Sequence, residues 1–399
     1  MPGSLIVGGA RTPIGKLSGV LAALRAVELG GVAVAGALER AGVAPELVDH
    51  VIMGHVLQAG QGQITARQAA VRAGIPMTTP ALTVNKVCLS GLNAIYLADQ
   101  LVAAGDAEIV VAGGMESMTN APHLLPGARA GWRLGDAAVV DATLHDGLTC
   151  PFDGCSMGEG TERHLHAGAA GGVTRERQDD LAALSHERAA AAAAAGLLAE
   201  EIVAVSIPQR RGDPVMVEAD EGIRPGTTTA TLTALRPAFA AGGTLTAGNA
   251  SQISDGAAAV VVASPSAVER LGLHPLGKVV SYGQVAGPDP SLLHQPSRAA
   301  LRALERAGLG VADVDLFEIN EAFAAVVVAS MDDLGIGPEV TNVNGGAIAL
   351  GHPIGMSGAR LALTLLLALG RRGGGVGVAA LCGGGGQGDA LVVRAPASA

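Results

Sequence analysis

Segments typical of buried strands alternate with segments typical of helices along most of this chain. The strand-like segments of the first part are residues 5–10, 50–56, 81–87 and 108–114, and the helix-like segments are residues 20–41 and 89–104. Each helix-like segment ends at a glycine, Gly42 or Gly105, which favours a helix stop there. Strands that alternate with helices predict an α/β fold with parallel strands.

The alternation is interrupted between about residues 119 and 245, where Pro, His, Gly and Asp cluster around an Ala-rich helical run at 176–196. We expect an inserted, loop-rich domain in this part. Alternation then resumes in the segments 255–264, 314–319, 321–334, 341–344, 357–369, 376–382 and 388–393.

The two halves of the chain are weakly similar to each other. VNKVCLSGLNA at 84–94 and VNGGAIALGHPIGMSGA at 343–359 both place a Val-Asn strand end before a Ser-Gly that opens a helix. This similarity favours a duplicated α/β domain. The expected division is an N-terminal domain of residues 1–118 completed by about 246–270, the insert 119–245, and a C-terminal domain of residues 271–399.

Composition excludes several classes of protein. With 49% hydrophobic and 16% charged residues among 399, the chain is not a disordered one, and much of its surface is expected to be buried between elements or subunits. The net charge of -10 and the 2% aromatic content argue against nucleic acid as a partner. Continuous apolar runs such as 361–369 are shorter than the ~18 residues of a membrane helix. Four unevenly spaced cysteines suit a reducing compartment, so we expect a cytoplasmic protein.

Two cysteines end predicted strands. Cys88 lies between a strand end and a helix start, where free amide groups and the helix dipole favour a thiolate; the alternative is a small buried apolar residue. Cys382 precedes GGGGQG, a backbone that could direct N–H groups at a carbonyl oxygen. The string 383–388 also fits the GxGxxG dinucleotide pattern, but the 11 residues after Gly388 cannot supply the required helix, second strand and acidic residue.

A histidine and an asparagine also follow predicted strands, as the two cysteines do. His352 lies in the glycine-bounded loop GGAIALGHPIGMSG, with Pro353 restricting the backbone after it; a solvated loop histidine is the alternative. Asn320 follows the strand-like LFEI, and its alternative role is to cap the next helix. Because ligands of open α/β sheets bind at the carboxyl ends of strands, these two residues with Cys88 and Cys382 predict one site. One cysteine with a histidine can carry an acyl group, and a second cysteine suits proton transfer at carbon.

A competing set of residues could be interpreted as a zinc site. Its members are His145, Cys150, Asp153, Cys155, His164 and His166. The C-x4-C spacing lies at the upper edge of zinc patterns and no second cysteine pair follows, so a His-rich surface loop is the favoured interpretation and no metal is expected.

Eight motifs in this chain together resemble those of the thiolase family. They are GARTPIGK (9–16), VNKVCLSG (84–91), AGGMESMTNAPH (112–123), IRPGTTTATLTALRPAF (223–239), GTLTAGNASQISDGAA (243–258), EINEAFA (318–324), GGAIALGHPIGMSG (345–358) and CGGGGQGDA (382–390). They follow the family order across nearly the whole chain. The resemblance implies a five-layered αβαβα fold, a loop domain over the coenzyme A site, and a homodimer or homotetramer.

The resemblance also implies roles for the site residues. Cys88 would take an acyl group from a coenzyme A thioester, His352 would activate it, and Cys382 would exchange a proton with the α-carbon of a second acetyl-CoA. One oxyanion would lie against His352 and a water held by Asn320, the other against the amides of Cys88 and Gly384. The implied contacts to coenzyme A and the acyl group are Arg224, Thr231, Ala247, Ser251, Met157, Phe239, Ala322 and Phe323.

The expected reaction is the reversible condensation of two acetyl-CoA to acetoacetyl-CoA and CoA, with no permanently bound cofactor. A broad 3-ketoacyl-CoA thiolase is the near alternative, because Ser156 stands where several acetoacetyl-specific members carry His. A decarboxylating condensing enzyme is disfavoured by the second cysteine. A binding module for CoA or lipid that retains only the fold is the alternative from another class.

Overall fold

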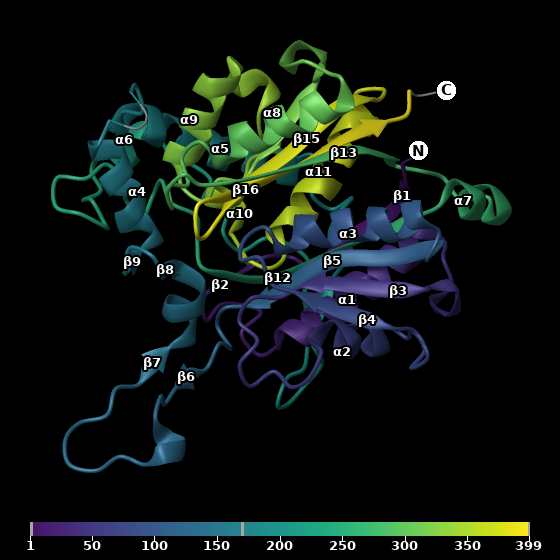
Figure 1. Ribbon diagram of the computed structural model, residues 1–399, viewed down its shortest axis with the longest axis horizontal. Coiled ribbons are helices and arrows are strands. Elements are labelled where there is room, and N and C mark those ends of the chain that lie inside the picture. Colours follow the sequence, from purple (N-terminus) through teal and green to yellow (C-terminus); the bar gives the residue numbers. More distant parts are fainter. Residues whose placement is uncertain (1–2, 169–170, 398–399) are drawn as a thin grey trace.

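A ten-stranded mixed sheet forms the framework of the protein within residues 3–168 and 171–397, the part that the computed structural model describes (Figure 1). The strand order is β14-β15-β16-β13-β1-β12-β5-β3-β4, and β2 pairs with β12. The bounds are β1 Leu5–Arg11, β2 Gly15–Lys16, β3 His50–Gly54, β4 Ala81–Val84, β5 Ile109–Ser117, β12 Ser254–Ala263, β13 Gly277–Ala286, β14 Leu316–Ile319, β15 Gly375–Gly383 and β16 Gln387–Ala395.

The sheet consists of two halves joined by a short pairing. Only Leu5 with Lys278 and Ile6 with Gly277 connect β1 to β13. The expectation of parallel strands is wrong for most of the sheet: β3 pairs in parallel with β4 and β5, and β14 with β15, whereas all other ladders of the sheet are antiparallel. The physical reason is that β12, β13 and β16 each run antiparallel to both of their neighbouring strands. The alternation of strands and helices along the sequence does not reveal these directions.

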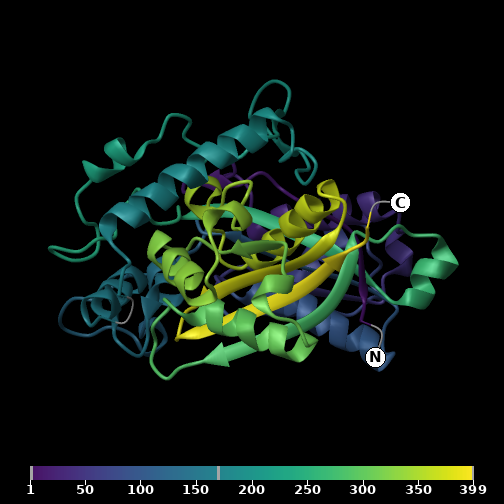
Figure 2. The same cartoon turned by 90° about the horizontal axis from the view of Figure 1, so that it is seen from above.

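Helices cover both half-sheets and also fill the space between them, which gives the five αβαβα layers of the expected fold (Figures 1 and 2). Helices α1 and α2 cover the outer face of the half-sheet β1, β12, β5, β3, β4, and α8 and α9 cover the outer face of the other half. Helices α3 and α11 form the central layer. The bounds are α1 Ala26–Ala41, α2 Thr65–Arg72, α3 Ser90–Ala104, α8 Gln295–Ala307, α9 Ala324–Leu334 and α11 Ser357–Arg371.

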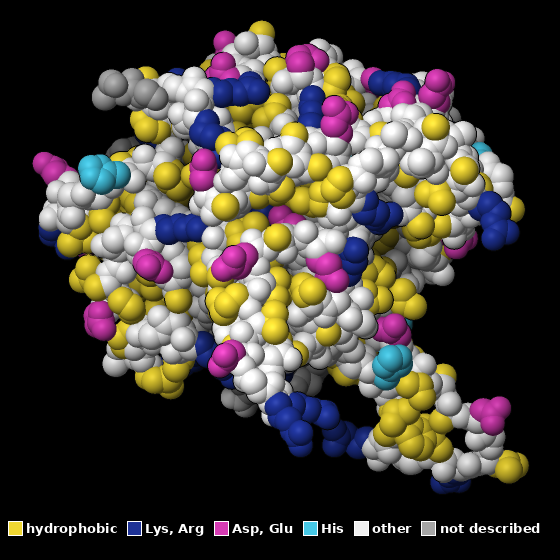
Figure 3. Space-filling view, turned by 180° about the vertical axis from the view of Figure 1, so that it is seen from behind, with side chains coloured by type: hydrophobic (Ala, Val, Ile, Leu, Met, Phe, Trp, Pro, Cys, Tyr) yellow, Lys and Arg dark blue, Asp and Glu magenta, His cyan; other side chains and the backbone are white. Residues whose placement is uncertain are grey.

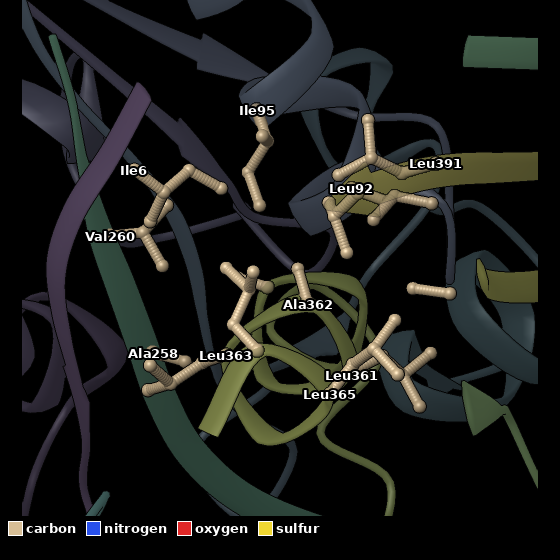
Figure 4. Close-up of a cluster of buried hydrophobic side chains, with 14 of the residues drawn as sticks. Ile6, Leu92, Ile95, Ala258, Val260, Leu361, Ala362, Leu363, Leu365 and Leu391 are labelled. Atoms are coloured by element: carbon tan, nitrogen blue, oxygen red, sulfur yellow. The ribbon is translucent and has the colours of Figure 1, made fainter. Parts of the chain in front are cut away.

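Alternate side chains of each central strand enter different hydrophobic clusters. In β12, Ala258 and Val260 face the central helices together with Leu363 of α11, whereas Ala259 and Val261 face α1 (Figure 4). All ten residues of β12 are buried. A strand with apolar side chains on both faces requires a helix layer on each side, which explains the continuous apolar runs of the sequence.

The central helices α3 and α11 approach each other closely at two glycines. A Cβ on Gly91 would lie 2.9 Å from the amide nitrogen of Ala359, and a Cβ on Gly358 would lie 2.8 Å from Cβ of Leu92. Side chains at these positions would hold the helices apart. The high glycine content thus has a specific use at this contact.

The part expected as an insert, residues 119–245, is rich in loops and short hairpins. It contains the hairpins β6 His123–Leu124 with β7 Val140–Asp141, β8 Thr149–Cys150 with β9 Cys155–Ser156, and β10 Val205–Ile207 with β11 Val215–Val217, and the helices α4 Met157–His166, α5 Arg175–Ala194 and α6 Thr229–Thr233. The remaining helices are α7 Pro265–Leu271 and α10 Ala347–Leu350, with short helical turns at Pro45–Leu47, Ala128–Ala130, Thr143–Leu148, Val311–Asp313 and Pro338–Val340.

Three sequence predictions differ from the structure in their detail. The first helix begins at Ala26 and not at residue 20, because residues 17–24 form turns. The helix predicted from residue 321 begins at Ala324. The segment 341–344 is not a strand: Thr341 forms one isolated bridge with Phe317, and Asn342 then takes a positive φ of 47° that ends any pairing.

One stretch within the described residues, Val87–Ala104, is long and apolar enough to cross a membrane by length and composition alone. It corresponds to α3, which lies in the central layer with Leu92, Ile95 and Ala98 fully buried. This stretch is an exception to the expectation that the apolar runs of the chain are shorter than a membrane span. Its place between two half-sheets is that of a core helix.

Candidate active site

Cys88 lies on a strained turn between β4 and α3. Val87, directly before it, has a φ of +50°, a conformation that is rare for a β-branched residue. Ser90 stabilises this turn, since its hydroxyl accepts a hydrogen bond from the Lys86 amide at 2.8 Å and donates one to the Val87 carbonyl at 2.6 Å. The sulfur thus stands at the start of a helix, as the sequence predicts.

The environment of Cys88 keeps its thiol protonated. Burial raises its pKa to about 12, and Glu116 acts in the same direction. Hydrogen bonding from its own amide and from that of Gly384 acts in the opposite direction. These two amides are the groups expected to bind an oxyanion, and both are directed at the sulfur. Because the thiol is protonated at neutral pH, Cys88 requires a base to become a nucleophile.

His352 has the properties of such a base. Its Nδ1 lies 2.6 Å from the hydroxyl of Ser357, and that hydroxyl donates to the Pro353 carbonyl at 3.0 Å. Since the hydroxyl proton is used in that bond, Nδ1 carries the imidazole proton and Nε2 carries the lone pair. Burial lowers the pKa of His352 to about 3, with a smaller contribution from Arg360. The ring is therefore neutral at physiological pH and able to accept a proton on Nε2.

Asn320 lies beside this lone pair. Its backbone continues the pairing of β14, with the amide donating to Ala380 at 2.9 Å, and its Nδ2 lies 3.4 Å from Nε2 of His352. Asn320 is fully buried, and its Oδ1 has no hydrogen-bond partner among the described residues. A buried acceptor without a partner next to a base is suited to hold a water or a substrate donor.

Cys382, near the end of β15, shares a cavity with Cys88 and His352, whereas Asn320 is not among the residues that line it. The cavity has a volume of about 60 Å³. It is lined by Cys88, Cys382, His352, Gly383, Gly384, Val87, Gly147, Leu148, Met157, Ser251, Leu292, Ala322, Phe323 and Ile354. Burial raises the pKa of Cys382, and the neighbouring Cys88 raises it further. The two sulfurs and the imidazole, which lie far apart in the sequence, therefore face one enclosed space.

A larger apolar cavity of about 310 Å³ lies beside the first and shares seven of its lining residues, among them His352 and Met157. The five expected contacts Ser251, Met157, Phe239, Ala322 and Phe323 all line it. Phe239 and Phe323 meet edge to face, with ring centroids 5.7 Å apart and an interplanar angle of 86°. The arrangement offers an apolar passage that ends at the sulfurs.

Three of the expected coenzyme A contacts lie outside these cavities. Arg224, Thr231 and Ala247 are exposed and line neither the smaller nor the larger one. The Arg224 amide donates to Nδ1 of His186 at 3.2 Å, while the Thr231 hydroxyl is engaged with the backbone of Thr228 at the start of α6.

The zinc alternative finds no support in the structure. Cys150 and Cys155 face each other across the β8–β9 hairpin, and both are free thiols. Among residues 3–168 and 171–397, no three His, Cys, Asp or Glu side chains are grouped so that they could hold a metal ion. The region instead borders a cavity of about 520 Å³, which His145 and Phe152 help to line.

Sequence reasoning missed two residues that organise the site. Ser357 fixes the tautomer of His352, and its position five residues after that histidine, at the start of α11, was a usable signal. Glu116 is fully buried and accepts hydrogen bonds from the amides of Val56, Leu57 and Gly355 at 3.0 to 3.1 Å. It thereby ties β3 to the loop that carries His352. Nothing local to the end of β5 indicates that role.

The site defines a cysteine-dependent acyl-transfer protein, with a thiol, a neutral imidazole, a second thiol and amide donors around one cavity. Family comparison agrees with this class. Residues 4–266 match the model of the thiolase N-terminal domain, and residues 273–395 match that of the thiolase C-terminal domain. The chain belongs to the thiolase family.

Relatives match over their full length. The chain is 56% identical over 395 residues to a probable acetyl-CoA acetyltransferase of Mycobacterium tuberculosis, covering 99% of this chain and 100% of the relative. It is 52% identical over 391 residues to an acetyl-CoA acetyltransferase of Cupriavidus necator, covering 98% of each chain. It is 47% identical to that of Pseudomonas aeruginosa, again over 98% of each.

Proposed function

We propose that this protein is an acetyl-CoA C-acetyltransferase, which reversibly condenses two acetyl-CoA to acetoacetyl-CoA and CoA. One observation carries the proposal: Cys88, Cys382 and His352 line the same small cavity at the end of an apolar passage. Hydrolysis of a thioester would need only one of the two thiols, whereas carbon–carbon bond formation needs a separate group for the proton at carbon. The names of the full-length relatives support the same activity.

In the first half of the reaction, Nε2 of His352 accepts the proton of Cys88. The sulfur attacks the thioester carbonyl, a bond forms between Cys88 and the acetyl carbon, and the bond to the CoA sulfur breaks. The proton on Nε2 passes to the leaving CoA thiolate, so charge and atoms balance. The amides of Cys88 and Gly384 would stabilise the tetrahedral oxyanion.

In the second half, Nε2 of His352 takes the proton of Cys382, and the resulting thiolate accepts a proton from the methyl carbon of a second acetyl-CoA. The enolate attacks the acetyl group on Cys88, and collapse of the adduct releases acetoacetyl-CoA and the Cys88 thiolate, which recovers the proton held on Nε2 of His352, so that both thiols and the neutral imidazole are restored. His352 and a water on Oδ1 of Asn320 would stabilise the enolate oxygen. The unpartnered Oδ1 and the buried thiol of Cys382 support these roles.

The proposed route for coenzyme A runs along the apolar passage, with Ser251, Met157, Phe239, Ala322 and Phe323 around the acyl and pantetheine groups. Arg224, Thr231 and Ala247 would contact the nucleotide outside the cavity, where a cation helps an acidic protein to hold an anionic substrate. The substrates are acetyl-CoA, CoA and 3-ketoacyl-CoA, and no permanently bound cofactor is proposed.

A broad 3-ketoacyl-CoA thiolase is the second candidate, and one observation favours it. Ser156, a small side chain, lines the 310 Å³ cavity beside Leu144 and Met118. A longer acyl chain could occupy this apolar space. The two candidates share every catalytic step and differ only in the length of the acyl group.

We further propose that the protein works in the cytoplasm as a homodimer or homotetramer. The division into residues 1–118 with 246–270, 119–245 and 271–399 is supported by β12, which completes the first half-sheet after the insert. Assembly is supported by exposed apolar side chains on the β6–β7 hairpin and its connection, namely Leu125, Trp132, Leu134 and Val139.

Acetylation of the intact protein tests the assignment. Incubation with acetyl-CoA should place one acetyl group on the peptide that contains Cys88, detected by mass spectrometry. Cys88→Ser should abolish both the adduct and thiolysis. Cys382→Ser should retain the adduct but lose thiolysis and condensation by about a thousandfold or more, because only the second half needs that thiol. A wild-type protein without the adduct would refute the proposal, and faster thiolysis of long 3-ketoacyl-CoAs than of acetoacetyl-CoA would favour the second candidate.

A further inference from the structure

The two sulfurs of the site belong to different half-sheets. An ion pair connects these half-sheets close to both sulfurs. Lys86 lies two residues before Cys88, and its ammonium contacts the carboxylate of Asp389 at 2.7 and 3.0 Å. Asp389 lies on β16 and is paired with Leu381 of β15, directly before Cys382. The contact therefore runs from the turn of one thiol to the strand of the other.

This ion pair is built into the interior. Asp389 is fully buried, while the side chain of Lys86 is 21% exposed. The hydroxyl of Tyr282 on β13 donates a further hydrogen bond to Oδ2, the carboxylate oxygen that lies 3.0 Å from the Lys86 ammonium. A buried carboxylate is costly unless each oxygen is paired, and here both oxygens are.

Helix α3, which begins directly after Cys88, is attached to the same group. The ring of Tyr96 stacks on that of Tyr282, with centroids 4.3 Å apart and planes at 11°. Nδ2 of Asn93 lies 3.4 Å from the Tyr282 hydroxyl. The turn and the following helix thus share one anchor on β13 and β16.

The turn needs such an anchor because it is strained. Val87 holds a φ of +50°, which is a strained conformation for a β-branched residue and persists only where the surroundings enforce it. Ser90 and the side chain of Asn85 bond the turn locally. Lys86 is the residue of the turn whose side chain reaches across to the other half-sheet.

We propose that Lys86, Asp389 and Tyr282 form a clamp that positions the Cys88 turn against the strand end of Cys382. The clamp residues are positioning residues, since none of them lines the catalytic cavity. The inference rests on the proposed function for its effect on rate, but the clamp itself is a structural claim. Its loss would let the acyl group on Cys88 drift from the amide of Gly384 and from Cys382.

The first test is independent of activity. In the intact protein, Asp389→Asn removes the charge at constant shape, and Lys86→Met serves as a second variant should the first not fold. Hydrogen exchange of peptides covering 85–91 and 383–388 should become about tenfold faster or more, while β12 remains protected. Unchanged exchange in both peptides overturns the clamp.

A matched control is available in the chain. Arg175 and Asp179 form an ion pair of the same length, 2.7 Å, with nearly the same exposures of 23% and 0%. Asp179 also accepts from a second side chain, Asn249. Asp179→Asn should lower thermal stability to a similar degree without changing exchange in 85–91 or 383–388. Equal effects of both variants on those peptides would show a general loss of stability and overturn the clamp.

The second test separates positioning from folding. Asp389→Asn should lower kcat of thiolysis about tenfold or more per folded molecule, with KM for CoA changed about twofold or less. Lys86→Arg, which keeps the charge, should retain kcat within about threefold. Unchanged kcat in Asp389→Asn overturns the role in catalysis. A wild-type protein with the protected turn but no thiolysis would refute the proposed function while leaving the clamp intact.

Discussion

His352 is set apart from an ordinary histidine by its burial and by two fixed neighbours. Ser357 holds the proton on Nδ1, and Asn320 faces Nε2. Because burial lowers the pKa to about 3, the ring stays neutral over the whole physiological range. The proposed base therefore does not lose its function on mild acidification, and any acid limb of the activity near pH 6 has to arise from another group.

The same lowered pKa predicts how stability depends on pH. Between pH 6.5, the ordinary value, and about 3, the unfolded chain binds a proton on His352 that the folded protein does not. The free energy of unfolding therefore falls as the pH falls through this range. His352→Asn lacks this effect, so between pH 7 and 5 the wild type should lose about 2 kcal/mol more than the variant.

Urea denaturation of both proteins at each pH measures that difference. Comparing the two is necessary because buried carboxyl groups such as Glu318, whose pKa burial raises to about 8, have the opposite effect in both proteins. Parallel stability curves for the wild type and the variant would contradict the prediction.

At the residue scale, the sequence located the thiols and the asparagine because strand ends are visible as ends of apolar runs. Asn320 directly follows β14 and Cys382 is the last residue but one of β15, whereas β4 ends at Val84, three residues earlier than predicted, and Cys88 lies on the turn that leads to α3. The partners Ser357 and Glu116 were not found, because their roles depend on contacts formed only when the central helices cross the sheet. The clamp residue Asp389 is 303 positions from Lys86, and no local pattern links them.

At the scale of the elements, α3 and α11 cross without space for added side chains at their glycines. Gly358 lies in α11 opposite Leu92 of α3, and a methyl group there would press on the backbone of that helix. Both helices begin at segments of the proposed active site, the Cys88 turn and the His352 loop. Their separation therefore also sets the distance between thiol and imidazole.

Two alanine substitutions in α11 should act in opposite directions. Gly358→Ala introduces a Cβ 2.8 Å from that of Leu92 and should cost about 1–3 kcal/mol through overpacking. Gly370→Ala in the same helix meets nothing within 4 Å and should stabilise by up to about 1 kcal/mol. Thermal unfolding followed by circular dichroism measures both. A higher unfolding temperature for Gly358→Ala would show that the helices can separate freely.

Element types could largely be predicted, and strand directions could not. The runs at 5–10, 108–114 and 255–264 are strands because apolar residues on both faces require two covering layers. Whether neighbours run parallel depends on where each connection crosses the sheet. The long insert returns the chain to β12 between β1 and β5, which makes those ladders antiparallel.

On the scale of the whole molecule, one hairpin projects from the compact body. Figure 3 shows hydrophobic side chains on this projection at the lower right, the region of β6, β7 and their connection. Leu125, Trp132, Leu134 and Val139 are each about half exposed or more. An apolar tip that extends away from its own core is expected to be covered, and a second copy of the chain is the occupant that the proposed assembly supplies.

Sedimentation velocity tests this assembly. The wild type should sediment as a dimer or tetramer, and Leu134→Asp should shift it to a smaller species, since a charge would be buried in the contact. Met216→Asp, at an apolar side chain that is 52% exposed on the β10–β11 hairpin, is the control and should leave the mass unchanged. Trp132 is the single tryptophan, so its emission should be blue-shifted in the assembled wild type. A monomeric wild type would refute the proposal.

Only two residue pairs join β1 to β13, yet each side of that junction contributes a sulfur to the cavity. A polypeptide severed in the connection between α7 and β13 would give one fragment with the acyl-accepting thiol and another with the imidazole, the carboxamide and the second thiol. Neither fragment contains a complete set of reacting groups. Catalytic turnover would then directly measure whether the two fragments had reassociated.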